Sequence, residues 1–235
     1  MAKQPTIFVK GSIGNVIFYE RNGRPYARSK PGSVKQTANM KQRSLNFGIA
    51  ARAGKTLRVQ LAPLLPFPKD RRMQSRFSGA LSQWLGTQPI HELLPQPAVA
   101  ALHGYNFNEA CRLAERFKAP VHVSLPPGGQ VAIDIPAFVP TQALAAPAHT
   151  AYAELTIITT ACRLAAAMPV ATEIFSLRMH YNNTEQPAQQ LQYSIAAQPG
   201  MLVLVAASVS FWRSNGKKEM REGYLPAGVL GAAYW

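Results

Sequence analysis

The sequence predicts an α+β protein: an N-terminal β-hairpin or meander plus two amphipathic helices, followed by a C-terminal immunoglobulin-like β-sandwich. Three observations support this prediction. Two Asn-Gly pairs, at residues 22–23 and 215–216, are typical of tight hairpin turns. Apolar residues recur at helical spacing between residues 38 and 85. Beyond residue 119, seven short runs rich in β-forming residues alternate with turn residues.

The N-terminal region has the composition of a small β-meander. Thr6–Lys10 and Asn15–Glu20 are rich in residues that favour strands. Asn22 and Gly23 then favour a two-residue type I′ turn, because both tolerate positive φ angles. We therefore expect a hairpin whose returning strand is Tyr26–Ser29.

Two helices are predicted after the hairpin. Thr37 can cap the first, which we expect to run from Ala38 to Ala62. Its apolar stripe at i+4 spacing is Leu45, Ile49, Ala53, Leu57 and Leu61. Asp70 is expected to cap the second helix and Gly86 to end it. Its core-facing stripe is Met73, Phe77, Leu81, Trp84 and Leu85.

The remaining chain is predicted to be mostly strands. The expected domains are a basic hairpin-and-helix arm at 1–88, a linker with a short helix (Asn108–Lys118) at 89–118, and the sandwich at 119–235. The apolar run Met201–Ala207 indicates a strand that is covered on both faces. The seven expected strands are Val121–Leu125, Gln130–Ile135, Ala151–Leu164, Ile174–Tyr181, Gln189–Ala196, Met201–Arg213 and Lys217–Tyr224.

The net charge of +14 lies entirely in the first third of the chain. Residues 1–80 hold sixteen Lys and Arg against only Glu20 and Asp70, whereas the rest of the chain holds nine basic and nine acidic residues. Such an asymmetry favours a partner with dense negative charge, above all nucleic acid. The alternative is that these cations simply lie in solvent on the outer faces of the helices and the hairpin, without a partner molecule.

The candidate nucleic-acid or anion-binding residues combine tyrosines of the hairpin with cations of the hairpin and helices. Exposed aromatic rings can stack on bases while nearby cations meet phosphates. Basic residues in the first turns of the second helix oppose the helix dipole unless an anion offsets them. The candidates are Tyr19, Arg21, Arg24, Tyr26, Arg28, Lys41, Arg52, Lys55, Arg58, Arg71, Arg72 and Arg76.

Catalytic and metal signatures are missing from the sequence. Its five histidines are isolated, and its two cysteines, Cys111 and Cys162, lie too far apart for a zinc motif, so we expect buried free thiols. Ser124, His122 and Asp134 could be drawn as a triad, but Ser and His on one strand are expected to point to opposite faces. We therefore predict no catalytic residue, no metal and no cofactor, and hence a protein that is not an enzyme.

The first ten residues lack the apolar stretch of a signal peptide, and no apolar run is long enough to span a bilayer. These features predict no membrane insertion and a cytoplasmic location, or incorporation into an assembly or virion.

Both ends of the chain resemble an uncharacterised family of Bacteroidota proteins with a Gly-rich basic N-terminal hairpin and a C-terminal β domain. The N-terminal motifs are Gly11-x-x-Gly14-x-Val16, Gly23, Tyr26-x-Arg28-Ser29, Lys35-x-Thr37 and a helix with Arg43. The C-terminal motif is residues 209–218, VSFWRSNGKK. This chain has Met40 where that family commonly has Gln. The resemblance implies the two-part layout and assigns no activity.

Two functions therefore remain. In the first, a non-enzymatic protein uses its basic arm to contact a polyanion, with nucleic acid favoured, while the β-sandwich supports assembly. In the second, copies of the protein form a homo-oligomer, filament, tube or virion in which the arm interlocks neighbours without nucleic acid.

Overall fold

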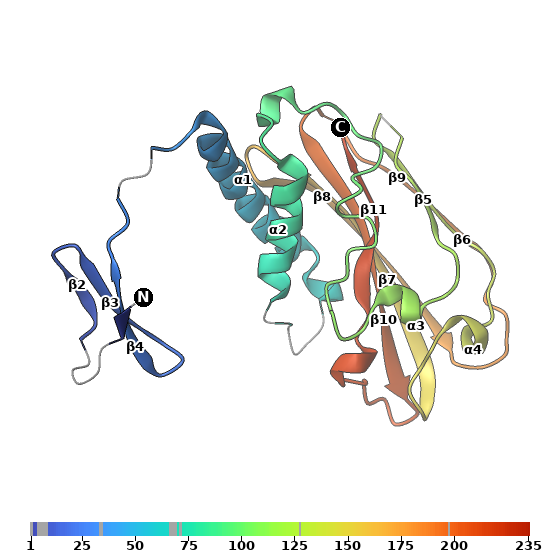
Figure 1. The fold of residues 1–235 in the computed structure, drawn as a ribbon. Coiled ribbons are helices and arrows are strands. Elements are labelled where there is room, and N and C mark those ends of the chain that lie inside the picture. The colour runs from blue at the N-terminus through green and yellow to red at the C-terminus, as the bar shows by residue number, and fades with distance from the viewer. Residues whose placement is uncertain are drawn as a thin grey trace. The chain divides into compact units, whose positions relative to one another are not determined.

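The computed structural model describes residues 2–3, 9–32, 35–65, 70, 72–126, 128–196 and 198–235 (Figure 1). The chain forms two compact units, Met1–Met40 and Lys41–Trp235.

The first unit is an antiparallel four-stranded sheet with strand order β1-β4-β3-β2. Its strands are β1 (Ala2–Lys3), β2 (Gly11–Ile13), β3 (Val16–Arg21) and β4 (Arg24–Ser29). The predicted turn is confirmed, because Asn22 (φ 52°) and Gly23 (φ 73°) both adopt the positive φ of a type I′ turn. The expected strand Thr6–Lys10 falls mostly outside the described residues.

Two long helices begin the second unit: α1 (Ala38–Gln60), whose first residues belong to the preceding unit, and α2 (Met73–Leu85). The hydroxyl of Thr37 accepts a hydrogen bond from the Met40 amide (3.2 Å), so the predicted cap is present. The helices pack closely at Gly54, where a Cβ atom would lie 3.3 Å from Leu81 and from Ser78. A short 3-10 helix (Ala62–Leu64) follows α1.

In the first half of α1 the buried face is shifted by one residue from the predicted stripe, since Asn46 and Ala50 are buried in place of Leu45 and Ile49. Leu45 is 63% exposed, whereas Asn46 is fully buried. The Asn46 amide donates to the backbone carbonyls of Leu85 (3.4 Å), Gly86 (3.1 Å) and Gln88 (2.9 Å). Carbonyls at a helix C-terminus lack partners within the helix. Their need for a donor turns the polar Asn46 inward and leaves Leu45 outside.

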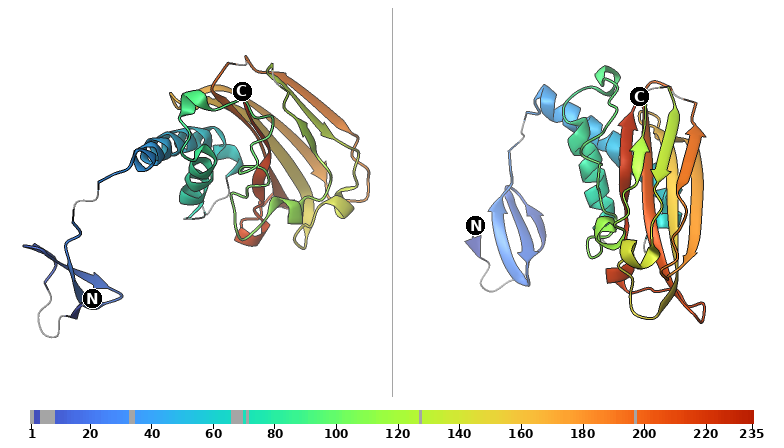
Figure 2. Two further views of the ribbon diagram at one scale, coloured as in Figure 1. Left: turned by 45° about the horizontal axis from the view of Figure 1, so that its top comes forward. Right: turned by 90° about the vertical axis from the view of Figure 1, so that its right-hand side faces the viewer.

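Seven strands form two antiparallel sheets in the second unit (Figure 2). One sheet has the order β11-β10-β7-β8 and the other β5-β6-β9. The bounds are β5 (His122–Ser124), β6 (Gln130–Ile135), β7 (Thr150–Arg163), β8 (Met168–His180), β9 (Gln189–Ser194), β10 (Met201–Arg213) and β11 (Ala227–Tyr234). Two four-residue helices, α3 (Leu113–Arg116) and α4 (Pro140–Ala143), and two 3-10 helices, Ile90–Glu92 and Glu222–Tyr224, lie in the connections.

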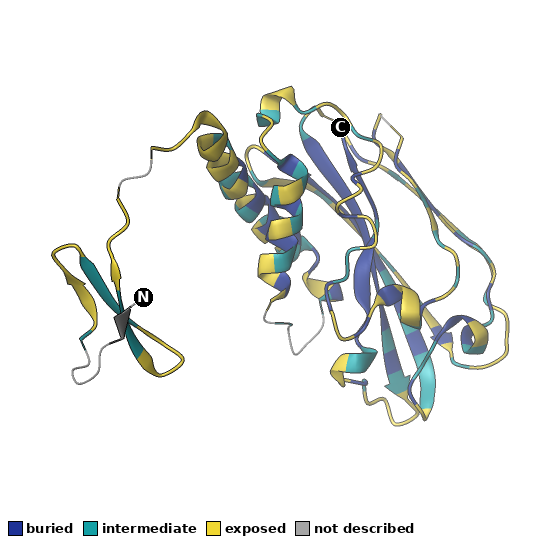
Figure 3. Ribbon diagram, in the orientation of Figure 1, coloured by how far each residue is buried: buried dark blue, intermediate teal, exposed yellow. Residues whose placement is uncertain are grey.

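The four-stranded sheet is covered on both faces. One face shares a core with β5, β6 and β9, and the other packs against α1 and α2. Residues 201–209 of β10 are all buried, as the apolar run predicted (Figure 3). Alternate β10 residues divide between the two cores: Val203 and Val205 belong to the first, and Leu202 and Leu204 to the second.

The fold class is mixed α and β, mostly β, with three sheets. The division into units differs from the expected boundaries, because α1 and α2 share a core with the sheet instead of forming an arm that ends at residue 88. The expected linker at 89–118 lies along β11, where the Val99 and Phe107 amides donate to Ala232 and Ala227. The expected helix Asn108–Lys118 is reduced to α3.

The last expected strand was wrong: Lys217–Tyr224 forms no strand and ends in the 3-10 helix Glu222–Tyr224, and the strand beside β10 at this edge of the sheet is β11. The Asn215-Gly216 turn is present, with Gly216 at φ 75°. After the turn, the buried Glu219 carboxylate accepts hydrogen bonds from the Arg221 guanidinium and from the backbone amides of Met220 and Arg221. The Arg221 side chain, opposed by burial and helped by these amides, lowers the pKa of Glu219 to about 2. The segment pairs with β10 only at its start, through the Trp212–Lys218 bridge and the hydrogen bond from the Glu219 amide to the Phe211 carbonyl.

We predict that Gly231 in β11 resists any larger side chain. An added Cβ would lie 2.9 Å from Cγ1 and 3.3 Å from Cβ of Val123 in β5. Gly231→Ala should therefore lower the free energy of unfolding by about 1–3 kcal/mol. Gly48→Ala in α1 is the control: nothing lies within 4 Å there, and the change should be neutral or stabilising. Urea unfolding measures both, and equal effects would contradict the prediction.

Candidate anion-binding site

The hairpin places five predicted residues on one face of the first sheet. In the β3–β4 register, Tyr19 pairs with Tyr26 and Arg21 with Arg24, while Arg28 lies opposite Ile17. Residues two apart in a strand point to the same face. The face therefore carries an arginine pair, then a tyrosine pair, then Arg28.

The two tyrosine rings stack, with centroids 5.8 Å apart and an interplanar angle of 25°. The Arg28 guanidinium lies over the Tyr19 ring, 5.6 Å from its centroid. A hollow of about 460 Å³ is lined by Tyr19, Arg21, Asn22, Arg24 and Tyr26. Aromatic rings and cations thus meet at one concave place within this unit.

The electrostatics of the first unit favour anions. It holds seven basic residues against a single acidic one, Glu20. Glu20 forms an ion pair with Lys10 (2.7 Å) and, one residue out of phase with Tyr19 and Arg21, lies on the other face of β3. Within the described part of the chain, no carboxylate is within ion-pair distance of Arg21, Arg24 or Arg28.

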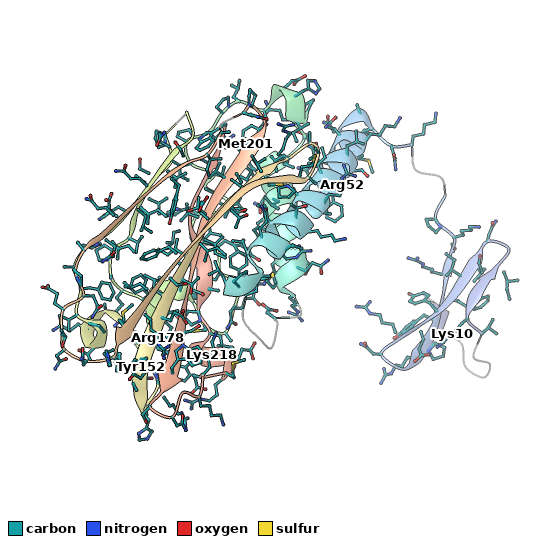
Figure 4. The ribbon with its side chains drawn as sticks, turned by 180° about the vertical axis from the view of Figure 1, so that it is seen from behind. Lys10, Arg52, Tyr152, Arg178, Met201 and Lys218 are labelled. Atoms are coloured by element: carbon teal, nitrogen blue, oxygen red, sulfur yellow. The ribbon has the colours of Figure 1, made fainter. Side chains whose placement is uncertain are left out.

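The α1 helix carries a second group of predicted cations. Lys41, Arg52 and Lys55 are exposed on one side of the helix, and Arg52 projects from it in Figure 4. The helix contains no Asp or Glu, and Arg43, which was not predicted, adds a further exposed cation.

Arg58 was predicted on the outer face of α1 but is only partly accessible. It lines a hollow of about 490 Å³ with Lys55 and Val59, and its Nη1 atom is buried with no hydrogen-bond partner among the described residues. Burial lowers the pKa of Arg58, with a small opposing effect of Tyr105.

Arg76 is held by the protein itself. Its guanidinium forms ion pairs with Asp70 (2.5 Å) and Glu109 (3.3 Å), and donates to the carbonyls of Asn106 (3.1 Å) and Phe107 (3.4 Å). Burial opposes ionisation of Asp70, but the Arg72 amide and the Arg76 side chain outweigh it and lower the pKa of Asp70. The anion that offsets this helix N-terminus is therefore internal. Arg72 is exposed, and Arg71 lies outside the described residues.

We predict that Arg76 contributes to stability and not to anion binding. Arg76→Met leaves Asp70 partly buried without its partner, so the free energy of unfolding should fall by about 2 kcal/mol. The control Arg72→Met removes an exposed cation and should change it by less than about 0.5 kcal/mol. Chemical denaturation and heparin binding measure both variants. A loss of heparin affinity in folded Arg76→Met would contradict the prediction.

Sequence reasoning missed a cation and aromatic cluster at one end of the four-stranded sheet. One row of paired residues crosses β8, β7, β10 and the segment after the Asn215-Gly216 turn: His180, Tyr152, Trp212 and Lys218. The Arg178 guanidinium lies over the rings of Tyr152 (5.1 Å) and Trp212 (5.9 Å), and Lys218 lies over Trp212 (5.5 Å) (Figure 4). The predicted Asn-Gly turn was a signal for the Trp212–Lys218 neighbourhood, but the β7–β8 register was not visible in the sequence.

The chemistry of other polar groups is limited. Across the described ranges, no three His, Cys, Asp or Glu side chains are placed to hold a metal. Cys111 and Cys162 are buried and free, and burial raises the pKa of Cys162 to about 11, which keeps the thiol protonated. Within the same ranges, no helix is long and apolar enough to cross a membrane.

The expectation that Ser124 and His122 point to opposite faces of one strand is wrong. His122 and Ser124 are two residues apart in β5, so they share the exposed face, and His122 lies directly opposite Asp134. No hydrogen bond joins these three side chains among the interactions of the described residues.

Comparison with known proteins found no matching family model, no matching curated protein and no matching solved structure.

Proposed function

We propose that this chain is a non-enzymatic binding and structural protein whose N-terminal unit contacts a polyanion, with nucleic acid favoured, and whose β body supports assembly. The observation that carries the proposal is the hairpin face. It places an arginine pair and a tyrosine pair around one hollow, with Arg28 beside them on the same face, and none of the described residues that line the hollow is a carboxylate.

The charge distribution supports the same proposal. Three hairpin arginines lie close together on one small sheet without internal ion pairs among the described residues. Like charges held this close repel one another until an anion neutralises them. Arg76 shows the contrast, since it sits among internal carboxylates and carbonyls.

We predict that polyanion binding depends on salt and on the arginine pair. The double variant Arg21→Gln/Arg24→Gln removes two phosphate contacts, so binding should weaken. The negative slope of log K against log salt concentration should become shallower by about 1.4–1.8. Fluorescence anisotropy with labelled DNA, measured over a range of salt concentrations, gives the slope. Lys118→Gln, an exposed cation outside the hairpin, is the control.

Two results would count against polyanion binding. One is the absence of binding to DNA and to heparin at low salt. The other is an affinity that does not change with salt, because contacts to phosphates release counterions and must respond to it.

The proposal for the body is an immunoglobulin-like sandwich that pairs with further copies. Two antiparallel sheets with a shared core, in the orders β5-β6-β9 and β8-β7-β10-β11, support the sandwich. The open side of β8 supports assembly. This 13-residue edge strand pairs only with β7 in the described structure, and it exposes Met168 (57%), Val170 (37%) and Ile174 (56%). Antiparallel pairing of two β8 strands centred on Ile174 would bring this side chain against its own copy.

We predict that Ile174→Lys prevents assembly of the full chain, because it places like charges opposite each other at the centre of the paired edge. The wild-type protein should form oligomers in light scattering as concentration rises, and the variant should stay monomeric. Leu94→Lys replaces an apolar residue outside the sheets that is more exposed (73%) than Ile174 (56%), and is the control. A wild-type protein that is monomeric at every concentration would refute assembly through β8.

A further inference from the structure

We propose that the hairpin face binds single-stranded nucleic acid by stacking bases on its tyrosine pair, in preference to duplexes and to polyanions without bases. This inference rests on the proposed function and names its ligand class. Tyr19 and Tyr26 form the stacking platform, and Arg21, Arg24 and Arg28 contact the phosphates on either side.

The face alternates cation, ring and cation at a spacing that suits an extended strand. Successive residues on one face of a β-strand lie about 6.6 Å apart, twice the rise per residue. The Arg21–Arg24 pair, the Tyr19–Tyr26 pair and Arg28 occupy three successive positions of this repeat. A single strand laid along the hairpin therefore meets charge, then an aromatic surface, then charge again.

The dimensions and chemistry of the hollow fit a planar base with its phosphate. Its volume of about 460 Å³ is within the usual range for sites that hold small ligands. Two rings and two guanidinium groups line it, together with Asn22, which can both donate and accept hydrogen bonds. These rings are half-buried, whereas Arg21 and Arg24 are exposed.

A duplex uses this face less well. Its bases are already stacked on each other and offer only their edges in the grooves, so the tyrosine pair has no ring to contact. In a single strand the base faces are accessible, and stacking tolerates every base. Arginines alone would bind single-stranded and duplex DNA equally well. The tyrosine pair is therefore the feature that favours binding of the single strand.

The test compares four probes on the full-length protein at one salt concentration: a thymidine oligomer, a duplex, heparin, and an abasic oligomer with the same number of phosphates as the thymidine oligomer. We expect the thymidine oligomer to bind roughly 5- to 160-fold more tightly than the abasic oligomer, the range for stacking one base. This comparison needs no variant and so does not depend on the folding of a mutant.

Variants then assign the effect to the rings. Tyr19→Leu and Tyr26→Leu should lose the same factor for the thymidine oligomer and leave heparin binding unchanged, whereas Tyr19→Phe and Tyr26→Phe should retain tight binding because the ring remains. Unchanged heparin binding also reports that the arginine face is still formed.

The outcomes separate the two proposals. Equal affinity for thymidine, abasic and duplex probes overturns base stacking and leaves polyanion binding intact. Tighter binding of the duplex also overturns it, in favour of groove contacts. Failure of all four probes to bind at low salt overturns the proposed function itself.

Discussion

The architecture of the body depends on burying the four-stranded sheet on both faces. Residues 201–209 of β10 are buried, and their side chains alternate between the two faces of the sheet, so each face needs an apolar layer packed against it. The sheet β5-β6-β9 supplies one layer and the helices α1 and α2 supply the other. Without the helices, Leu202, Leu204 and Ile158 would face water at a cost of about 1.5–3 kcal/mol each. The helices are therefore part of the body, although the outer surface of α1 is basic.

The same constraint sorts the cations of the chain into structural and accessible groups. Arg76 lies where α2 meets the 104–109 segment, and there Asp70, Glu109 and two carbonyls take up its donors. Arg58 is drawn toward the core as well, at the cost of a buried donor that has no hydrogen-bond partner among the described residues. The outer α1 cations and the hairpin arginines have no such surroundings in the described residues. Cations that the fold leaves without a neutralising carboxylate remain able to attract an anionic ligand.

The hairpin face shows how simple periodicity can build a site. Tyr19, Arg21 and their partners Tyr26 and Arg24 share a face because strand residues alternate and because the Asn22-Gly23 turn fixes the register. Glu20, one residue out of step, is directed to the other face and pairs with Lys10. A one-residue change of register would exchange these two faces and put a carboxylate among the arginines.

The amino-acid sequence by itself determined what depends on neighbours along the chain: both Asn-Gly turns, the ends of α1 and α2 to within two residues, strands β6 and β10, and the hairpin set of candidate residues. Tertiary structure decided the rest. It turned Asn46 inward to meet the end of α2, gave Arg76 its internal carboxylates, and made a strand of the Gly- and Ala-rich β11, where only small residues fit against Val123 and Tyr105. The physical reason is range. Turn and alternation signals act over a few residues, whereas carboxylate partners, helix rotation and close packing arise from residues that meet only after the chain folds.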